Sequence, residues 1–277
     1  MLLEPLRKIS WAFQLHYYIC FRTHRCRARF TDQVRVEAIE AALREICERH
    51  DYHLLQSKVY PDHLRCLLSL RPGQSISKVV QTIKANSARL FLEQFALSPP
   101  LWGRGFLARS VGRVRLGIVK RYIGEQAEHH GYENRICPPI SRYTTQEAIP
   151  LTAEHAAFDL NYHLVFATRY RRGVFDSALG EALIQYWLRV GATRGFIIDR
   201  VTILPDHVHL LVRIAAKMSI EECILSLLNN GQHFVCKHAS EALIKARIDQ
   251  LWQPSAYVGT CGRVTTALVK AFLSARD

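Results

Sequence analysis

Hydrophobic and polar positions alternate along this chain in one order that occurs twice. In the second half, two-residue periodicity predicts strands and helical spacing predicts helices, with strands at 162–168, 196–204, 208–214 and 256–260 and helices at 177–190 and about 219–238. In the first half, the same criteria give strands at 13–21, 52–60, 64–70 and 106–110 and helices at 34–49 and 76–95. One further helix ends each series, at about 114–126 and around Phe272.

This order, strand-helix-strand-strand-helix-strand, is typical of the ferredoxin-like split βαβ arrangement. The pattern therefore predicts an α+β protein with two ferredoxin-like domains, each with an antiparallel sheet and one appended helix.

Landmarks of the two halves keep nearly constant offsets, which indicates a tandem duplication. The offset is 145 for Leu15 and Leu160 and 144 for Pro61 and Pro205, and it is 150 both for Leu101-Trp102 with Leu251-Trp252 and for Gly112 with Gly262. We place copy one at residues 1–126 and copy two at 158–277. The polar stretch between them, 127–157, with Cys137-Pro138-Pro139, is predicted to be a linker.

Positive charge is concentrated in copy one. The chain carries a net charge of +13, of which residues 1–150 contribute +10, from 23 Lys and Arg against 13 Asp and Glu. Such an excess favours a polyanionic partner, because neutralised phosphates release their condensed counterions. Arginines follow the first strand of each copy at matching places, and we predict that they contact the nucleic-acid backbone: Arg22, Arg25, Arg27 and Arg29 in copy one, and Arg169, Arg171 and Arg172 in copy two.

Cysteines and apolar runs point to an ordinary intracellular protein. The eight cysteines are scattered without a Cys-x2-Cys pair, which favours free thiols over zinc or disulfides. No uncharged apolar run approaches the roughly 18 residues of a membrane span, and the first residues do not form a secretory signal. We expect no membrane partner and a cytoplasmic, nucleoid-associated location.

Two motifs carry candidate chemistry. His207 and His209 are two residues apart on a predicted strand, so both side chains leave the same face, about 6 to 7 Å apart, and can converge on one cation. Tyr122 and Gln126 are four apart on a predicted helix and share its face. A tyrosine oxygen is a possible nucleophile and an amide oxygen a possible metal ligand. Each motif alone also fits ordinary packing or a polar surface.

Together these motifs resemble those of single-tyrosine transposases of the HUH superfamily, of the insertion sequence 200/605 or REP-associated type. The resemblance covers nearly all of both copies. The segments that carry it are Pro205-Asp206-His207-Val208-His209, Tyr162-His163-Leu164-Val165-Phe166, Arg169-Tyr170-Arg171-Arg172, Leu101-Trp102 and Val119-Lys120-Arg121-Tyr122-Ile123-Gly124-Glu125-Gln126.

The resemblance implies nicking and rejoining of single-stranded DNA, often near a hairpin, through a 5′-phosphotyrosine intermediate. By position, Tyr122 would be the nucleophile. His207, His209 and Gln126 would hold Mg²⁺ or Mn²⁺. Members of the family often build their sites in trans, with the histidines from one subunit and the tyrosine from the other.

Each copy has lost the half of the site that the other keeps. Copy one has His63 and Arg65 where copy two has the histidine pair, and copy two has Phe272 and Arg276 where copy one has Tyr122 and Gln126. A trans arrangement within one chain, an intramolecular pseudo-dimer, would leave one complete site and one degenerate site. We expect a monomeric pseudo-dimer, with pairing of two such molecules as an alternative. The arginines of the degenerate site would be available to hold DNA phosphates.

Two other readings remain open at this point. A domesticated, non-catalytic DNA hairpin-binding protein or repressor is compatible with the degenerate half and the basic first copy. Retention of all four groups of one composite site argues against it. RNA binding on a ferredoxin-like sheet ranks lower, because the strands lack the aromatic motifs of RNA-recognition domains.

Overall fold

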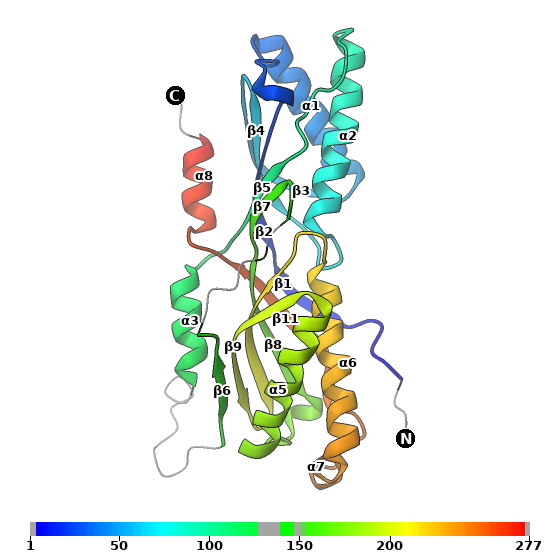
Figure 1. Ribbon diagram of the computed structural model, residues 1–277, viewed down its shortest axis with the longest axis vertical. Helices are drawn as coiled ribbons and strands as arrows, with labels where there is room; N and C mark the ends of the chain where they lie inside the picture. Colours follow the sequence, from blue (N-terminus) through cyan, green and yellow to red (C-terminus); the bar gives the residue numbers. More distant parts are fainter. Residues whose placement is uncertain (1–3, 127–138, 147–150, 152, 275–277) are drawn as a thin grey trace.

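The two copies form two α+β units that follow one another along the long axis of the molecule (Figure 1). The computed structural model describes residues 4–126, 139–146, 151 and 153–274. Copy one contains β2 (His16–Arg22), α1 (Gln33–Arg49), β3 (His53–Tyr60), β4 (His63–Ser69), α2 (Ile76–Gln94) and β5 (Phe106–Val111). Copy two contains β8 (Asn161–Thr168), α5 (Ser177–Arg194), β9 (Phe196–Leu204), β10 (His207–Ile214), α6 (Ile220–His238), α7 (Ser240–Ala246) and β11 (Trp252–Cys261).

The predicted ferredoxin-like fold is confirmed in both copies. The strands of copy one lie in the order β3-β4-β2-β5 and those of copy two in the order β9-β10-β8-β11, and all these neighbours are antiparallel. Two long helices pack on each sheet. The first helix of each copy begins at an aspartate, Asp32 or Asp176, whose carboxylate accepts a backbone N–H of the first turn and so satisfies a donor that has no partner within the helix.

One strand of each copy belongs to the other copy's sheet. β1 (Ser10–Gln14) runs parallel to β11, and β7 (Ala156–Asp159) runs parallel to β5. The predicted single strand at 13–21 is therefore wrong, because the chain passes from one sheet to the other at the buried Leu15. The alternation of apolar and polar residues continues through Leu15 because its side chain stays in the core. The pattern therefore shows which side chains are buried, but not to which sheet a strand belongs.

The segment predicted as a linker also contributes to the sheets. β6 (Ser141–Thr144) pairs antiparallel with β9 and closes that edge of copy two. β7 begins within the same segment. Neither strand was predicted, because four residues are too few for periodicity to be seen.

The appended helices cross between the copies. α3 (Leu116–Gly124) follows β5 of copy one but packs on β9 and β10 of copy two, and α8 (Thr266–Ser274) follows β11 but packs on β3 and β4 of copy one (Figure 1). Val119 and Ile123 of α3 contact Leu211 and Cys261. Their counterparts on α8, Val269 and Leu273, contact Leu67 and Val111. The chain is an intramolecular pseudo-dimer.

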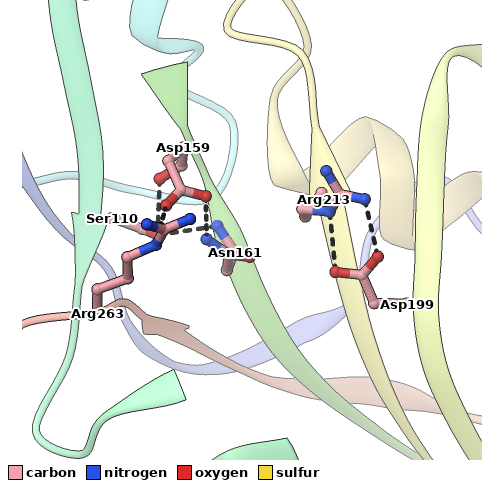
Figure 2. Close-up of polar contacts among 6 residues, drawn as sticks. All are labelled: Ser110, Asp159, Asn161, Asp199, Arg213 and Arg263. Carbon is pink, nitrogen blue, oxygen red and sulfur yellow. Dashed lines mark hydrogen bonds and ion pairs between the residues drawn. The ribbon is translucent and has the colours of Figure 1, made fainter. Parts of the chain in front are cut away.

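Polar groups join the copies where their chains cross. The hydroxyl of Tyr17 donates to that of Tyr162 at 3.1 Å, and both rings are buried. Ser110 accepts the backbone N–H of Asn161 at 2.8 Å, and Asn161 in turn donates to Asp159 at 2.7 Å (Figure 2). Figure 2 also shows the bidentate pair within copy two, in which Arg213 donates to Asp199 at 2.8 and 2.9 Å.

Two further properties concern the described residues as a whole. None of their helices is both long and apolar enough to cross a membrane. Their seven cysteines are free thiols. Cys137 lies outside the described residues.

Candidate active site

The histidine pair lies on β10, a central strand of copy two. Both side chains are almost fully buried, with 3 % of His207 and 5 % of His209 exposed. Their ring centroids are 5.1 Å apart. Because β10 is hydrogen-bonded to β8 and β9 on its two sides, the pair sits on a rigid support.

A carboxylate holds the first histidine. Nδ1 of His207 lies 2.6 Å from Oδ1 of Asp206, and the same carboxylate forms an ion pair with Nε of Arg171 at 2.9 Å. Burial alone would raise the pKa of Asp206, but the hydrogen bond with His207 and the charges of His207 and Arg171 hold that pKa below its usual value. The carboxylate therefore stays ionised and favours a proton on Nδ1, so Nε2 is the nitrogen of His207 suited to ligate a metal.

A third histidine, His163 on β8, supports the second one. Its Nε2 lies 3.2 Å from Nδ1 of His209, and the two rings are stacked with centroids 5.5 Å apart. Burial lowers the pKa of His163 to about 4, so its ring is neutral at neutral pH. Sequence reasoning gave His163 no role in the site. Its contact follows from the pairing of β8 with β10, and no spacing along the chain contains that information.

Tyr122 comes from copy one and lies beside these histidines. Its ring centroid is 5.5 Å from that of His209 and 5.9 Å from that of His163, in both cases edge to face. Two side chains of β9 hold the backbone of α3 in place. Thr202 donates to the carbonyl of Ile123 at 2.6 Å, and Arg200 donates to that of Lys120 at 3.2 Å.

Gln126 lies just beyond the end of α3 rather than within it, since the helix ends at Gly124. The side chain is fully buried, and its Nε2 donates to the carbonyl of Tyr122 at 2.6 Å. Its Oε1 is buried without a hydrogen-bond partner among the described residues. A buried amide oxygen without a partner is able to accept a hydrogen bond or to coordinate a bound cation.

These donors fit a divalent cation. An amide oxygen suits Mg²⁺ or Mn²⁺, whereas imidazole nitrogens suit first-row transition metals, so of these two ions Mn²⁺ fits the mixed donor set better. Within the ranges that the structure describes, no group of three or more His, Cys, Asp and Glu side chains is arranged to hold a metal. Any third protein ligand for a metal at the two histidines would therefore be of another type, such as the amide oxygen of Gln126.

The degenerate site, formed by His63, Arg65 and Phe272, lies at the equivalent place on copy one. Nδ1 of His63 lies 2.7 Å from Asp62, as in the intact pair. The guanidinium carbon of Arg65 is 5.1 Å from the ring centroid of Phe272, which occupies the position of the tyrosine. Arg276 lies outside the described residues.

The basic segments form similar turns after β2 and β8. Arg25 and Tyr170 have positive φ values of 55° at equivalent places. The Leu-Trp pair of each copy holds the turn in place. The backbone carbonyls of Leu101 and Leu251 accept the N–H groups of His24 and Arg169, both at 2.8 Å. Arg171 forms an ion pair with Asp206, the residue that precedes His207. Most of the predicted arginines are exposed, namely Arg22, Arg25, Arg27, Arg171 and Arg172.

A cleft of about 550 Å³ adjoins the site between β1, β11 and the start of α3. Its lining includes Arg113, Val119, His163 and Tyr257. Tyr257 is 41 % exposed, and its ring centroid is 5.8 Å from that of His163. The cleft thus joins an exposed aromatic ring and a cation to the histidine cluster.

Both copies of the chain are similar in sequence to known transposases. The family described as "Transposase IS200 like" matches residues 11–126 and again residues 156–276. The ISDra2 transposase TnpA of Deinococcus radiodurans is 23 % identical over 119 residues, which are 43 % of this chain and 85 % of the relative. The transposase of insertion sequence IS200 from Salmonella typhimurium is 25 % identical over 114 residues, 41 % of this chain and 75 % of the relative.

Two solved structures were also matched. A putative transposase from Deinococcus radiodurans has a TM-score of 0.35 at 23 % identity and covers 42 % of this chain and 92 % of its own. A REP-associated tyrosine transposase bound to a REP hairpin has a TM-score of 0.30 at 18 % identity and covers 48 % of this chain and 76 % of its own.

The sequence comparisons define a transposase of the IS200 type. The chain belongs to the IS200-like transposase family, with the family's domain present twice in a tandem fusion.

Proposed function

We propose that this protein cuts and rejoins single-stranded DNA at one composite site built from both copies. In this proposal Tyr122 of copy one is the nucleophile. The observation that carries the proposal is the 5.5 Å separation of the Tyr122 and His209 rings, although these residues belong to different copies. The alternative pairing, on copy one, offers Phe272 and Arg65 instead.

The bonds that change are confined to one phosphate. Oη of Tyr122 loses its proton and attacks phosphorus, the bond from phosphorus to O3′ breaks, and the departing oxygen takes up a proton to become a 3′-hydroxyl. The DNA is then joined to the protein as a 5′-phosphotyrosine. A second 3′-hydroxyl reverses these changes, which rejoins the strand and releases Tyr122.

His207, His209 and Gln126 would hold the metal ion beside this phosphate. When bound, Mg²⁺ or Mn²⁺ would polarise a phosphate oxygen and stabilise the charge that develops in the transition state. Asp206 orients His207, and His163 orients His209. The bond from Gln126 to the Tyr122 carbonyl ties its position to that of the nucleophile.

We further propose that the DNA contains a hairpin. The REP-associated relative was solved with a REP hairpin, and the basic turns after β2 and β8 offer cations at the same place in both copies. One nucleophile per chain makes one cut at a time. Excision of an element would then require two molecules, whereas nicking and rejoining requires one.

A covalent-trapping assay tests this function. The protein is incubated with labelled single-stranded hairpins from the flanks of its own gene and Mn²⁺, beside Tyr122→Phe, His207→Ala and Phe272→Ala. We expect a DNA-linked protein band that disappears in Tyr122→Phe, falls by about 100-fold or more in His207→Ala, and persists in Phe272→Ala.

Binding without any covalent band, with every flanking sequence tried, would contradict the proposal and favour a non-catalytic hairpin-binding protein. A band that survives in Tyr122→Phe would assign the nucleophile to another residue.

A further inference from the structure

The degenerate site has gained cationic and aromatic groups rather than only losing ligands. With the offset of 144 that relates Pro61 to Pro205, Arg65 stands where copy two has His209. On the neighbouring strand, Lys58 replaces Thr202 and Tyr60 replaces Leu204. The register agrees in both sheets, because Lys58 pairs with Arg65 as Thr202 pairs with His209.

The arginine of this site is held between two aromatic rings. Its guanidinium carbon lies 4.6 Å from the ring centroid of Tyr60 and 5.1 Å from that of Phe272. The ring of Tyr60 also stacks on that of His63, with centroids 4.3 Å apart. Contact with both rings restricts the guanidinium group before a ligand binds, so binding costs less side-chain entropy.

Two polar atoms of this site are buried without a hydrogen-bond partner. Four side-chain atoms are in this state in the described part of the chain, and two of them are Nε2 of His63 and Nε of Arg65. Buried polar groups are normally satisfied. An anion with several oxygens, placed beside the guanidinium group, would satisfy Nε of Arg65.

We propose that the degenerate site binds a backbone phosphate of single-stranded DNA without a metal ion and without cutting it. The guanidinium group of Arg65 supplies fixed positive charge and paired donors for a phosphate. Phe272, which is 51 % exposed, offers a face on which a base stacks. Phe272 has no hydroxyl group, so the bound phosphate is not attacked there.

This inference rests on the proposed partner, single-stranded DNA, but not on cleavage. It gives the two halves of the pseudo-dimer different tasks on one strand. Copy two and α3 provide the reacting pocket, and copy one and α8 provide a fixed anchor.

Fluorescence anisotropy in EDTA tests the anchor. The probe is labelled oligothymidylate of about 20 nucleotides, and every protein carries Tyr122→Phe, so the strand stays intact. We expect Arg65→Ala to raise Kd about 10-fold and to reduce the slope of log K against log salt by about 0.7, the value for one lost phosphate contact on a single strand. Phe272→Ala is expected to raise Kd about 5-fold.

Arg44→Ala is the matched control. It removes the same charge from α1, on the opposite face of the same sheet from α8 (Figure 1). The Arg44 side chain is 62 % exposed. We expect less than a 2-fold change in Kd.

Arg65→His separates a binding role from a purely structural one. Combined with Arg276→Gln, this variant restores in copy one both the histidine pair and an amide at the position of Gln126. We therefore expect the weak binding seen in EDTA to recover with Mn²⁺, and we expect no such recovery in Arg65→Ala combined with Arg276→Gln. The metal site of copy two is the same in both variants and cancels in the comparison.

Equal binding by the parent, Arg65→Ala and Phe272→Ala would overturn the anchor, as would an equal loss in Arg44→Ala. The failure of this inference differs from the failure of the proposed function. If only the anchor proposal is wrong, the covalent adduct with Tyr122 still forms in the trapping assay. If only the proposed cleavage is wrong, no adduct forms, but Arg65→Ala still weakens DNA binding in EDTA.

Discussion

The second position of the His-x-His motif gives the two histidine strands their different chemistry. Asp62 with His63 and Asp206 with His207 make nearly the same contact, at 2.7 and 2.6 Å. The second position then differs, with Arg65 in copy one and His209 in copy two. Since a guanidinium group cannot ligate a cation, the difference decides which pocket is able to hold metal.

His163 acts on the site through its contact with His209. We expect His163→Leu to raise the Mn²⁺ concentration for half-maximal adduct formation about 10-fold, because His209 loses the partner that fixes its ring. Titration of the covalent band with Mn²⁺ measures this.

Tyr18→Phe is the control, because Tyr18 is the equivalent residue of copy one at the offset of 145. It should leave the Mn²⁺ requirement unchanged. If His163→Leu reduced the amount of adduct at saturating Mn²⁺ but did not shift the midpoint, His163 would not act through metal binding.

At the scale of elements, close backbone approach fixes how the copies cross. A Cβ atom on Gly112 would overlap the carbonyl oxygen of Thr260, and one on Gly262 would overlap that of Ser110. In each case the obstructing group is backbone of the other copy, which cannot swing aside. The same glycines accept the N–H groups that begin the crossed helices, as Leu116 donates to Gly262 and Thr266 to Gly112, both at 2.8 Å.

Gly112→Ala should therefore lower the free energy of unfolding by about 3 kcal/mol through steric overlap. Gly117→Ala, in the first turn of α3, meets no atom within 4 Å and should raise it by about 0.5 kcal/mol through helix propensity. Urea denaturation of both variants measures the difference. A Gly112→Ala protein as stable as the parent would show that the two chains do not approach this closely.

At the scale of the whole molecule, α3 and α8 each serve the copy that they do not follow. This crossed arrangement is tested by moving the tyrosine hydroxyl from α3 to α8. In Tyr122→Phe/Phe272→Tyr the tyrosine lies on α8, which packs on the strands that carry Arg65, so we expect no covalent adduct with DNA.

Tyr122→Phe alone gives the background for this experiment, and the parent gives the full signal. Adduct formation by the exchanged variant would mean that α8 reaches His207 and His209, which is the uncrossed arrangement.

Much of the fold could be predicted because each copy repeats the same local patterns. The core strands and long helices were predicted within a few residues, including both histidine strands. The boundary at Leu15, the short strands β6 and β7 and the helix α7 were missed. Alternation records which side of a strand is buried, and it is the same whether a strand joins its own sheet or another.

Residue patterns alone gave the candidate site as two separate halves, and the family resemblance predicted that the halves meet in trans. Residue type and spacing were enough to select His207, His209, Tyr122 and Gln126. The support from His163 was missed because it acts across strands and not along one.

The sequence by itself determined the duplication, the ferredoxin-like elements, the basic turns and the complementary losses in the two copies. These properties depend on residue identity and on spacing along one chain. Only the tertiary structure decided that α3 and α8 cross, that Tyr122 lies beside His209 and that Arg65 lies against Phe272. These contacts join positions about 90 to 210 residues apart in sequence. They depend on strand pairing and on the close backbone approach at Gly112 and Gly262, which local patterns do not encode.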